Sequence, residues 1–139
     1  MPNKFIVILA AAAVLVAVGA VYGKFFAVER CPPTGVIREI TVTAKKDGWR
    51  FTPEEIQADC GDKLAFTVVN EDEYDHGIAI DAFAISRRMP KESTIEFEIS
   101  LTKAGEFPYY CSVPCGEGVV DGVKRTHFDM IGRIKVKND

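Results

Sequence analysis

An uninterrupted apolar run near the N-terminus most constrains how this chain can fold. The nineteen residues from Phe5 to Gly23 carry no charged side chain. As a helix with a rise of about 1.5 Å per residue, this run nearly spans the ~30 Å hydrocarbon core of a bilayer. We therefore expect an N-terminal membrane segment over residues 1–28, a linker over residues 29–36 and a folded domain over residues 37–139.

Two interpretations of the N-terminal segment remain open. A cleaved signal peptide would use Lys4, the apolar middle and a small-residue cleavage site at Val18-Gly19-Ala20. An uncleaved transmembrane anchor would use the full length, with Phe25-Phe26 and Val28 extending its apolar character to the membrane interface. We favour the anchor, because the run is longer than the usual apolar region of about 7–15 residues in signal peptides. The domain would then lie on the extracytoplasmic, periplasmic side, either membrane-anchored or, after cleavage, secreted.

The folded domain has the sequence pattern of β-structure. Apolar and polar residues alternate in Ile37–Ala44, and no segment after residue 30 has a sustained helical period. Clusters of Gly, Pro, Asp and Lys separate short apolar segments, as turns separate strands. The pattern predicts an all-β Greek-key sandwich or barrel preceded by one helix. We expect about seven strands: Ile37–Ala44, Glu55–Ala58, Lys63–Asn70, His76–Asp81, Thr94–Ser100, Glu106–Cys111 and Ile131–Val136.

The few metal-ligating side chains of soft character fall close together in the sequence. Cys111 and Cys115 bracket Ser112-Val113-Pro114, and His127 and Met130 follow in the same C-terminal segment. The chain has only two histidines, and the other one is His76. Thiolate, imidazole and thioether ligands together suit copper better than other common metals. The sequence therefore predicts a copper site.

These segments resemble a known family. The run from Ile37 to Val136 is similar to a cupredoxin domain, and most similar to the CuA domain of cytochrome c oxidase subunit II. The resemblance lies in the strand entry CGDKLAF, the histidine strand HGIAI, the approach AGEFPYYC, the ligand loop CSVPCG and the final HFDM. The CSVPCG and HFDM motifs together with an upstream histidine are a specific signal.

The resemblance implies a ligand set and a cofactor. In a CuA centre, two cysteine sulfurs bridge two copper ions, and each ion takes one imidazole. The corresponding residues here are Cys111 and Cys115 as bridges, with His76 and His127 as the terminal ligands. Met130 and the backbone carbonyl of Val113 would be the weak axial ligands. A single copper ion is the alternative cofactor state.

The ligand loop departs from the family pattern in its length. The family places its second histidine four residues after the second cysteine, whereas His127 follows Cys115 by twelve. We interpret Val119–Thr126 as an eight-residue insertion. Asp121-Gly122 between valines is a turn signal, so the insertion can form an outward hairpin whose ends meet. The ligand geometry would then survive the insertion.

Other interpretations of the same residues remain open. Cys111 and Cys115 could form a disulfide in an oxidising compartment. With both histidines they could form a closed zinc site, and one of them alone could serve a mononuclear blue-copper site. Cys31 and Cys60 could form a disulfide that holds the linker against the domain.

Charge restricts the partners. Residues 1–30 carry a net charge of +2, which leaves −5 on the remaining residues of a chain whose net charge is −3. This balance argues against nucleic acid as a partner. Acidic residues precede His76 in the run Glu71–Asp75, and they form either a solvated turn or an acidic rim that steers a basic redox partner.

Together these features predict an electron carrier rather than a stand-alone enzyme. It would act in a respiratory chain, taking electrons from a soluble cytochrome c or copper protein and passing them to a membrane oxidase or reductase. No small-molecule substrate is expected, because nitrite or nitrous-oxide reduction needs further copper ligands and no histidine remains. The alternative function is a copper carrier or assembly factor that binds copper through the same cysteines.

Overall fold

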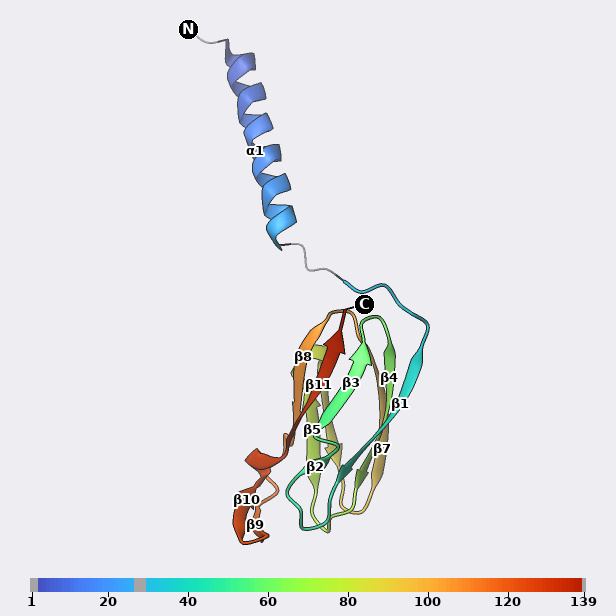
Figure 1. The fold of residues 1–139 in the computed structure, drawn as a ribbon. Coiled ribbons are helices and arrows are strands. Elements are labelled where there is room, and N and C mark those ends of the chain that lie inside the picture. Colours follow the sequence, from blue (N-terminus) through green and yellow to red (C-terminus); the bar gives the residue numbers. More distant parts are fainter. Residues whose placement is uncertain (1–2, 27–29, 139) are drawn as a thin grey trace.

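The apolar N-terminal run is a single helix. The computed structural model, which describes residues 3–26 and 30–138, places it as α1 (Lys4–Phe26) beyond one end of a β domain (Figure 1). An 18-residue window within Lys4–Lys24 has a mean hydropathy of 2.8, and the described side chains of α1 are exposed. A helix satisfies its own backbone hydrogen bonds, as lipid requires. By length and composition α1 can cross a membrane.

Two details of the predicted N-terminal segment fall outside the described part of the chain. The side chains of Phe25 and Phe26 and the whole of Val28 are not described, so their expected place at the interface remains a prediction. The same holds for the expected boundary between residues 28 and 29.

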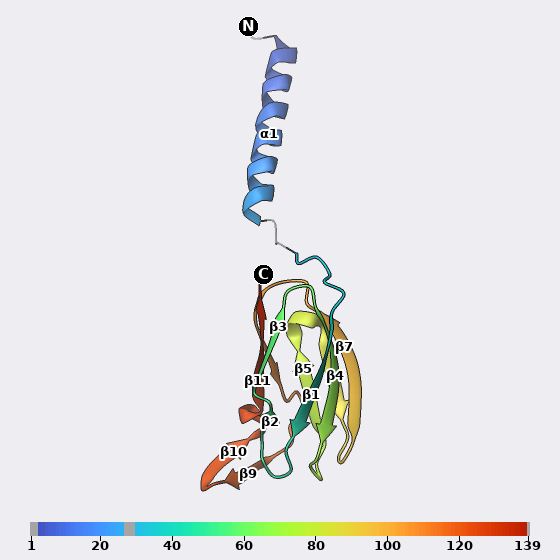
Figure 2. The same cartoon turned by 45° about the vertical axis from the view of Figure 1, so that its right-hand side comes forward.

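The β domain is a sandwich of two sheets, as the sequence predicted, and Figure 2 shows its two layers. Pairing is antiparallel except for β1 with β4 and β3 with β11, whose strands run parallel. One sheet has the order β2 (Phe51–Thr52), β1 (Ile37–Ala44), β4 (Lys63–Asn70), β7 (Thr94–Ser100). The other has the order β3 (Glu55–Asp59), β11 (Ile131–Lys137), β8 (Gly105–Tyr110), β5 (His76–Ile80), β6 (Ile85–Met89).

Three further elements lie outside the two sheets. The strands β9 (Glu117–Val120) and β10 (Val123–Thr126) form a separate hairpin. Two short 3-10 turns, η1 (Asp81–Phe83) and η2 (His127–Asp129), follow β5 and β10. All seven predicted strands are present, with ends that shift by at most one residue.

Alternation along the strands builds the core between the sheets. Leu64, Phe66 and Val68 of β4 are buried, and the Phe66 ring stacks on Phe97 of β7 at 5.0 Å between centroids. On the facing sheet, Tyr109 of β8 is fully buried, and its hydroxyl donates a hydrogen bond to a backbone carbonyl. Each large side chain buried in this way contributes about 1.5–3 kcal/mol through the hydrophobic effect.

Strand β6 was not predicted from the sequence, and its position explains why. Its residues Ile85–Met89 form an edge strand in which only Met89 is fully buried. Two arginines in five residues give no alternating pattern, because both faces of most of the strand contact solvent. The strand nevertheless matters for the site, since Met89 pairs with His76 at the start of β5.

The linker is held against the domain by the Cys31–Cys60 disulfide, which confirms the pairing that the sequence left open. The Cys31 amide donates to the Thr102 carbonyl at 3.0 Å, and the Thr34 amide donates to the Gly61 carbonyl at 3.0 Å. The Thr34 hydroxyl donates to the buried Asp62 carboxylate at 2.6 Å. This hydrogen bond, followed by the contact with Arg38, lowers the pKa of Asp62. Residues 31–36 therefore belong to the surface of the domain.

We expect the double variant Cys31→Ser/Cys60→Ser to lower the free energy of unfolding by about 3–4 kcal/mol, the loop-closure estimate for a separation of 29 residues. Urea unfolding of the metal-free chain in detergent, followed by fluorescence, measures this. The control is Ser86→Ala on the exposed edge strand, where we expect a change within about 0.5 kcal/mol. Equal stability of the two variants would contradict a stabilising role for the disulfide.

Candidate metal centre

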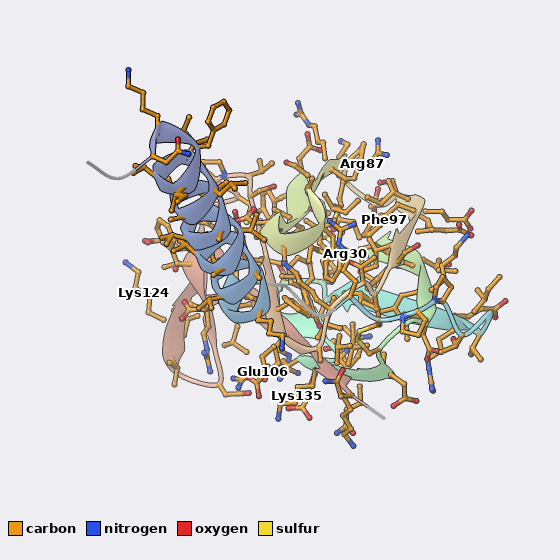
Figure 3. All side chains as sticks on the ribbon, turned by 90° about the horizontal axis from the view of Figure 1, so that it is seen from above. Arg30, Arg87, Phe97, Glu106, Lys124 and Lys135 are labelled. Atoms are coloured by element: carbon orange, nitrogen blue, oxygen red, sulfur yellow. A yellow bond between two sulfur atoms is a disulfide. The ribbon has the colours of Figure 1, made fainter. Side chains whose placement is uncertain are left out.

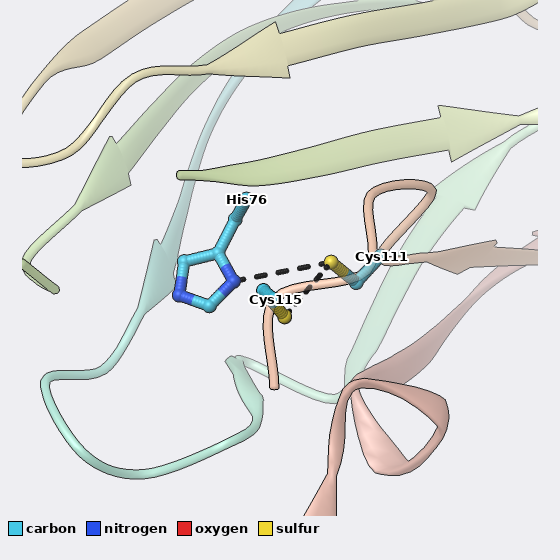
Figure 4. Close-up of side chains that lie close together, drawn as sticks. All are labelled: His76, Cys111 and Cys115. Carbon is cyan, nitrogen blue, oxygen red and sulfur yellow. Dashed lines mark hydrogen bonds between the residues drawn. The ribbon is translucent and has the colours of Figure 1, made fainter. Parts of the chain in front are cut away.

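Three predicted ligands meet at the end of the sandwich that lies opposite the linker. His76 begins β5, Cys111 directly follows β8, and Cys115 lies in the loop beyond. The Sγ atom of Cys111 lies 3.9 Å from Nδ1 of His76 and 3.5 Å from Sγ of Cys115 (Figure 4). The ligand atoms of these three residues all lie within 4.8 Å of one another. They come together because β5 pairs with β8 through Ala79 and Tyr110.

Two more predicted ligands complete this cluster. The thioether Sδ of the fully buried Met130 lies 3.8 Å from Sγ of Cys115. The carbonyl oxygen of Val113 lies 3.2 Å from Sγ of Cys111. A backbone hydrogen bond of 3.0 Å from the Cys111 amide to the Met130 carbonyl holds the two ligand segments together.

The insertion before His127 forms the expected hairpin. Val120 pairs with Val123 across the predicted turn, and Thr126 pairs with Glu117, so the end of the insertion returns beside the residues that precede it. The His127 amide donates to the Gly116 carbonyl at 3.2 Å, which brings the chain back beside the ligand loop. The hairpin also rests on the domain, since a side chain at Gly118 would collide with the ring of Trp49.

The position of His127 differs from that of the other ligands. Its side chain is not one of the three whose ligand atoms lie within 4.8 Å of one another. Its Nδ1 atom is buried and has no hydrogen-bond partner among the described residues. Burying a polar atom without a partner is costly, and a metal ion would remove that cost. The role of His127 as a ligand therefore remains a prediction with one supporting observation.

Sequence reasoning missed the residue that orients His76. The Oδ2 atom of Asp72 lies 3.1 Å from Nε2 of His76, and both side chains are buried. Asn70 accepts a hydrogen bond from the Asp72 amide and donates to the carbonyls of Tyr74, Met89 and Pro90. With its Nε2 atom bound to a carboxylate, the ring presents Nδ1 to the thiols. The only sequence signal is the spacing of four residues between Asp72 and His76.

The acidic run before His76 is not a free negative rim. Glu71 pairs with Lys45 at 3.3 Å, Glu73 pairs with Lys46 at 2.8 Å, and Asp75 pairs with Arg88. These hydrogen bonds lower the pKa values of Glu73 and Asp75. Each exposed carboxylate has a basic partner, and Asp72 is buried. The structure therefore favours the interpretation of this run as a turn and not as a steering surface.

A hydrogen bond couples the two thiols. The hydrogen bond from Cys115 lowers the pKa of Cys111 to about 4, against the effect of burial, and His76 lowers it further. The same hydrogen bond, together with burial, raises the pKa of Cys115. Burial disfavours a charged His76, but hydrogen bonds to Cys111 and Asp72 outweigh it and raise its pKa. The lowered pKa of Cys111 favours its thiolate, which is the state that binds metal.

The donor set fits copper. Cys111 and Cys115 are free thiols, so the alternative of a disulfide between them is wrong for this structure. Thiolate, imidazole and thioether donors lie in one buried cluster, which is the combination of a copper electron-transfer site. A closed zinc site uses Cys, His or carboxylate ligands and would leave the thioether of Met130 unexplained.

A two-sheet sandwich with a His–Cys–Cys–Met cluster at one end defines a class of copper-binding β proteins. The sequence profile of the cupredoxin-like domain matches residues 8–120, and the chain belongs to that family. The match ends before His127 and Met130. A search of curated protein sequences finds no match.

Solved structures share the fold at low sequence identity. The periplasmic domain of cytochrome oxidase subunit II (CoxB) of Bradyrhizobium japonicum has a TM-score of 0.55 at 20% identity, over 73% of this chain and 84% of that one. The blue copper protein auracyanin A of Chloroflexus aurantiacus has a TM-score of 0.56 at 15% identity, over 73% and 99%. A chain of a heme-copper terminal oxidase dimer has a TM-score of 0.57 at 18% identity, over 96% and 95%.

We expect Asp72→Ala to destabilise the metal-free chain by about 1–3 kcal/mol, because it leaves Nε2 of His76 buried without an acceptor. Copper affinity should fall by about 10–100-fold. Asp72→Asn keeps an acceptor for Nε2 of His76, so this variant should regain most of the stability and most of the copper affinity. Urea unfolding and copper titration against a competing chelator measure the two effects.

Asp75→Ala is the matched control, because its carboxylate is on the surface and pairs with Arg88. If Asp72→Ala behaves like Asp75→Ala in both measurements, Asp72 does not orient His76.

Proposed function

We propose that this chain is a membrane-anchored, extracytoplasmic electron-transfer protein with a binuclear, CuA-like copper centre. The observation that carries the proposal is the pair of free thiols, 3.5 Å apart and next to the His76 imidazole. Two sulfurs so close can both contact the same two ions. A mononuclear blue-copper site needs only one of them.

In this proposal the copper would be held by Cys111, Cys115, His76 and His127, with weaker contacts from Met130 and the Val113 carbonyl. Sulfur ligands favour Cu(I), and imidazole ligands also suit Cu(II). Copper held by both kinds of ligand would therefore supply a one-electron couple. The protein's part is to keep the donors fixed. His76 is held by β5 and Asp72, Cys111 by β8, and Met130 by its backbone hydrogen bond to Cys111.

The fold supports redox proteins as partners. Similar folds occur in an oxidase subunit II domain, which is periplasmic, and in a blue copper protein. We propose that electrons come from a soluble cytochrome c or copper protein and pass to a membrane oxidase or reductase. Only electrons would be exchanged, with no small-molecule substrate and no nucleic acid. The apolar helix α1 would hold the domain at the membrane.

Metal analysis with electron paramagnetic resonance on the full chain tests this proposal. We expect two copper ions per chain and a mixed-valence signal shared by both ions. One ion with a blue mononuclear spectrum would overturn the binuclear centre. A colourless Cu(I) form that loses its metal to a mild chelator would point to a copper carrier.

The bridging role makes Cys115→Ser the sharpest variant. We expect copper to fall from two ions to one and the mixed-valence signal to become mononuclear, because a hydroxyl does not replace a bridging thiolate. Met130→Leu is the control, since losing a weak axial thioether should shift the potential and keep both ions. Unchanged copper and spectra in Cys115→Ser would contradict the binuclear site.

Deleting Val119–Thr126 tests the assignment of His127. The deletion places His127 directly after Gly118, four residues from Cys115, and Gly118 already pairs with Arg125 near the end of the deleted segment. We expect the deletion variant to keep two copper ions, and His127→Gln in the full-length chain to lose copper affinity. Loss of copper on deletion, or full binding by His127→Gln, would show that His127 is not a ligand. Copper titration with electron paramagnetic resonance measures both.

A further inference from the structure

We propose that the short connection between α1 and the Cys31–Cys60 disulfide keeps the metal end of the domain turned away from the membrane. The soluble electron donor of the proposed function then reaches the centre from the aqueous side. The inference rests on the membrane attachment proposed above and not on the number of copper ions.

The attachment point and the metal centre lie at opposite ends of the sandwich. The disulfide joins Cys31 to Cys60 between β3 and β4, next to the Thr102 carbonyl after β7. Strand β4 then runs to Asn70, which is hydrogen-bonded to the loop that precedes His76. Figure 1 shows α1 and the C-terminus at one end and the β9–β10 hairpin towards the other. Seen from above in Figure 3, Lys124 of this hairpin lies at one side of the domain, away from Arg30.

The connection is too short for the domain to invert. Five Cα-to-Cα steps separate Phe26 from Cys31, and at about 3.6 Å each they span at most about 18 Å. Strand β4 alone, with eight residues, is about 25 Å long. The attached end therefore cannot rise far enough from the membrane for the metal end to stand against the bilayer.

Residues 31–36 would double this reach if they were free, but the domain holds them. The disulfide fixes Cys31, and the hydrogen bonds of Thr34 fix the middle of the segment. Gly61 permits the close fit, because a side chain there would collide with the Pro32 carbonyl oxygen. The disulfide thus sets both the stability of the linker and the direction in which the metal end faces.

The only tryptophan of the chain reports the height of the metal end above the membrane. Trp49 lies 6.2 Å from the His76 ring between ring centroids. We expect weak energy transfer from Trp49 to a dansyl-labelled lipid headgroup when the metal-free full chain is reconstituted in vesicles. The matched control, Trp49→Phe/Thr102→Trp, moves the donor to the exposed residue whose carbonyl accepts from Cys31, and transfer should be strong.

Flotation of the vesicles separates the possible outcomes. A chain that does not float with the vesicles overturns the membrane attachment and this inference with it. A chain that floats but transfers energy equally from both tryptophan positions overturns the inference alone. Weak transfer from Trp49 that increases when a flexible Gly-Ser segment is inserted between Arg30 and Cys31 supports it. Copper is absent throughout, so the result is independent of the proposed metal centre.

Discussion

The pairing of β5 with β8 is the interaction on which the rest of the site depends. It brings the start of one strand, His76, beside the residue that follows the other, Cys111, although 35 positions separate them in the chain. The approach is close, since a side chain at Gly77 would collide with Ser112 in the ligand loop. Because both strands belong to the core of a rigid sheet, the donors are positioned before any metal binds. This is the preorganisation that low reorganisation in electron transfer requires.

The hairpin insertion brings the chain back beside the ligand loop after eight additional residues. The insertion pairs partly within itself and partly with Glu117 and Gly118, so its entry and exit are neighbours, and the Gly116–His127 hydrogen bond closes the gap. The hairpin covers Trp49, which stacks on Tyr74 and meets the His76 ring edge to face. The insertion therefore changes the surface around the site more than the site itself. Of the predicted donors, only His127 lies outside the compact cluster, although Met130, which follows the same insertion, lies within it.

The two ends of the sandwich are stabilised by different sets of interactions. At one end the disulfide, the linker hydrogen bonds and the Arg38 ion pairs with Asp59 and Asp62 secure the connection to α1. At the other end a buried polar network of Asn70, Asp72 and His76 sets the direction of the imidazole. Buried polar groups are tolerated when each has its partner, and such a network specifies one arrangement. The separation places the candidate metal ligands and the connection to α1 about one strand length apart.

The sequence alone determined the class of fold, the seven main strands, the hairpin and the identity of the soft donors. These follow from local signals: alternation, turn residues, an apolar run and the spacing of scarce cysteines and histidines. Only the tertiary structure decided that Asp72 is a buried partner of His76 and not part of a charged rim, and that β6 completes a sheet. It also decided that the disulfide and the candidate metal ligands lie at opposite ends. Those features depend on contacts between residues distant in the chain, where burial and pairing override the local character of a side chain.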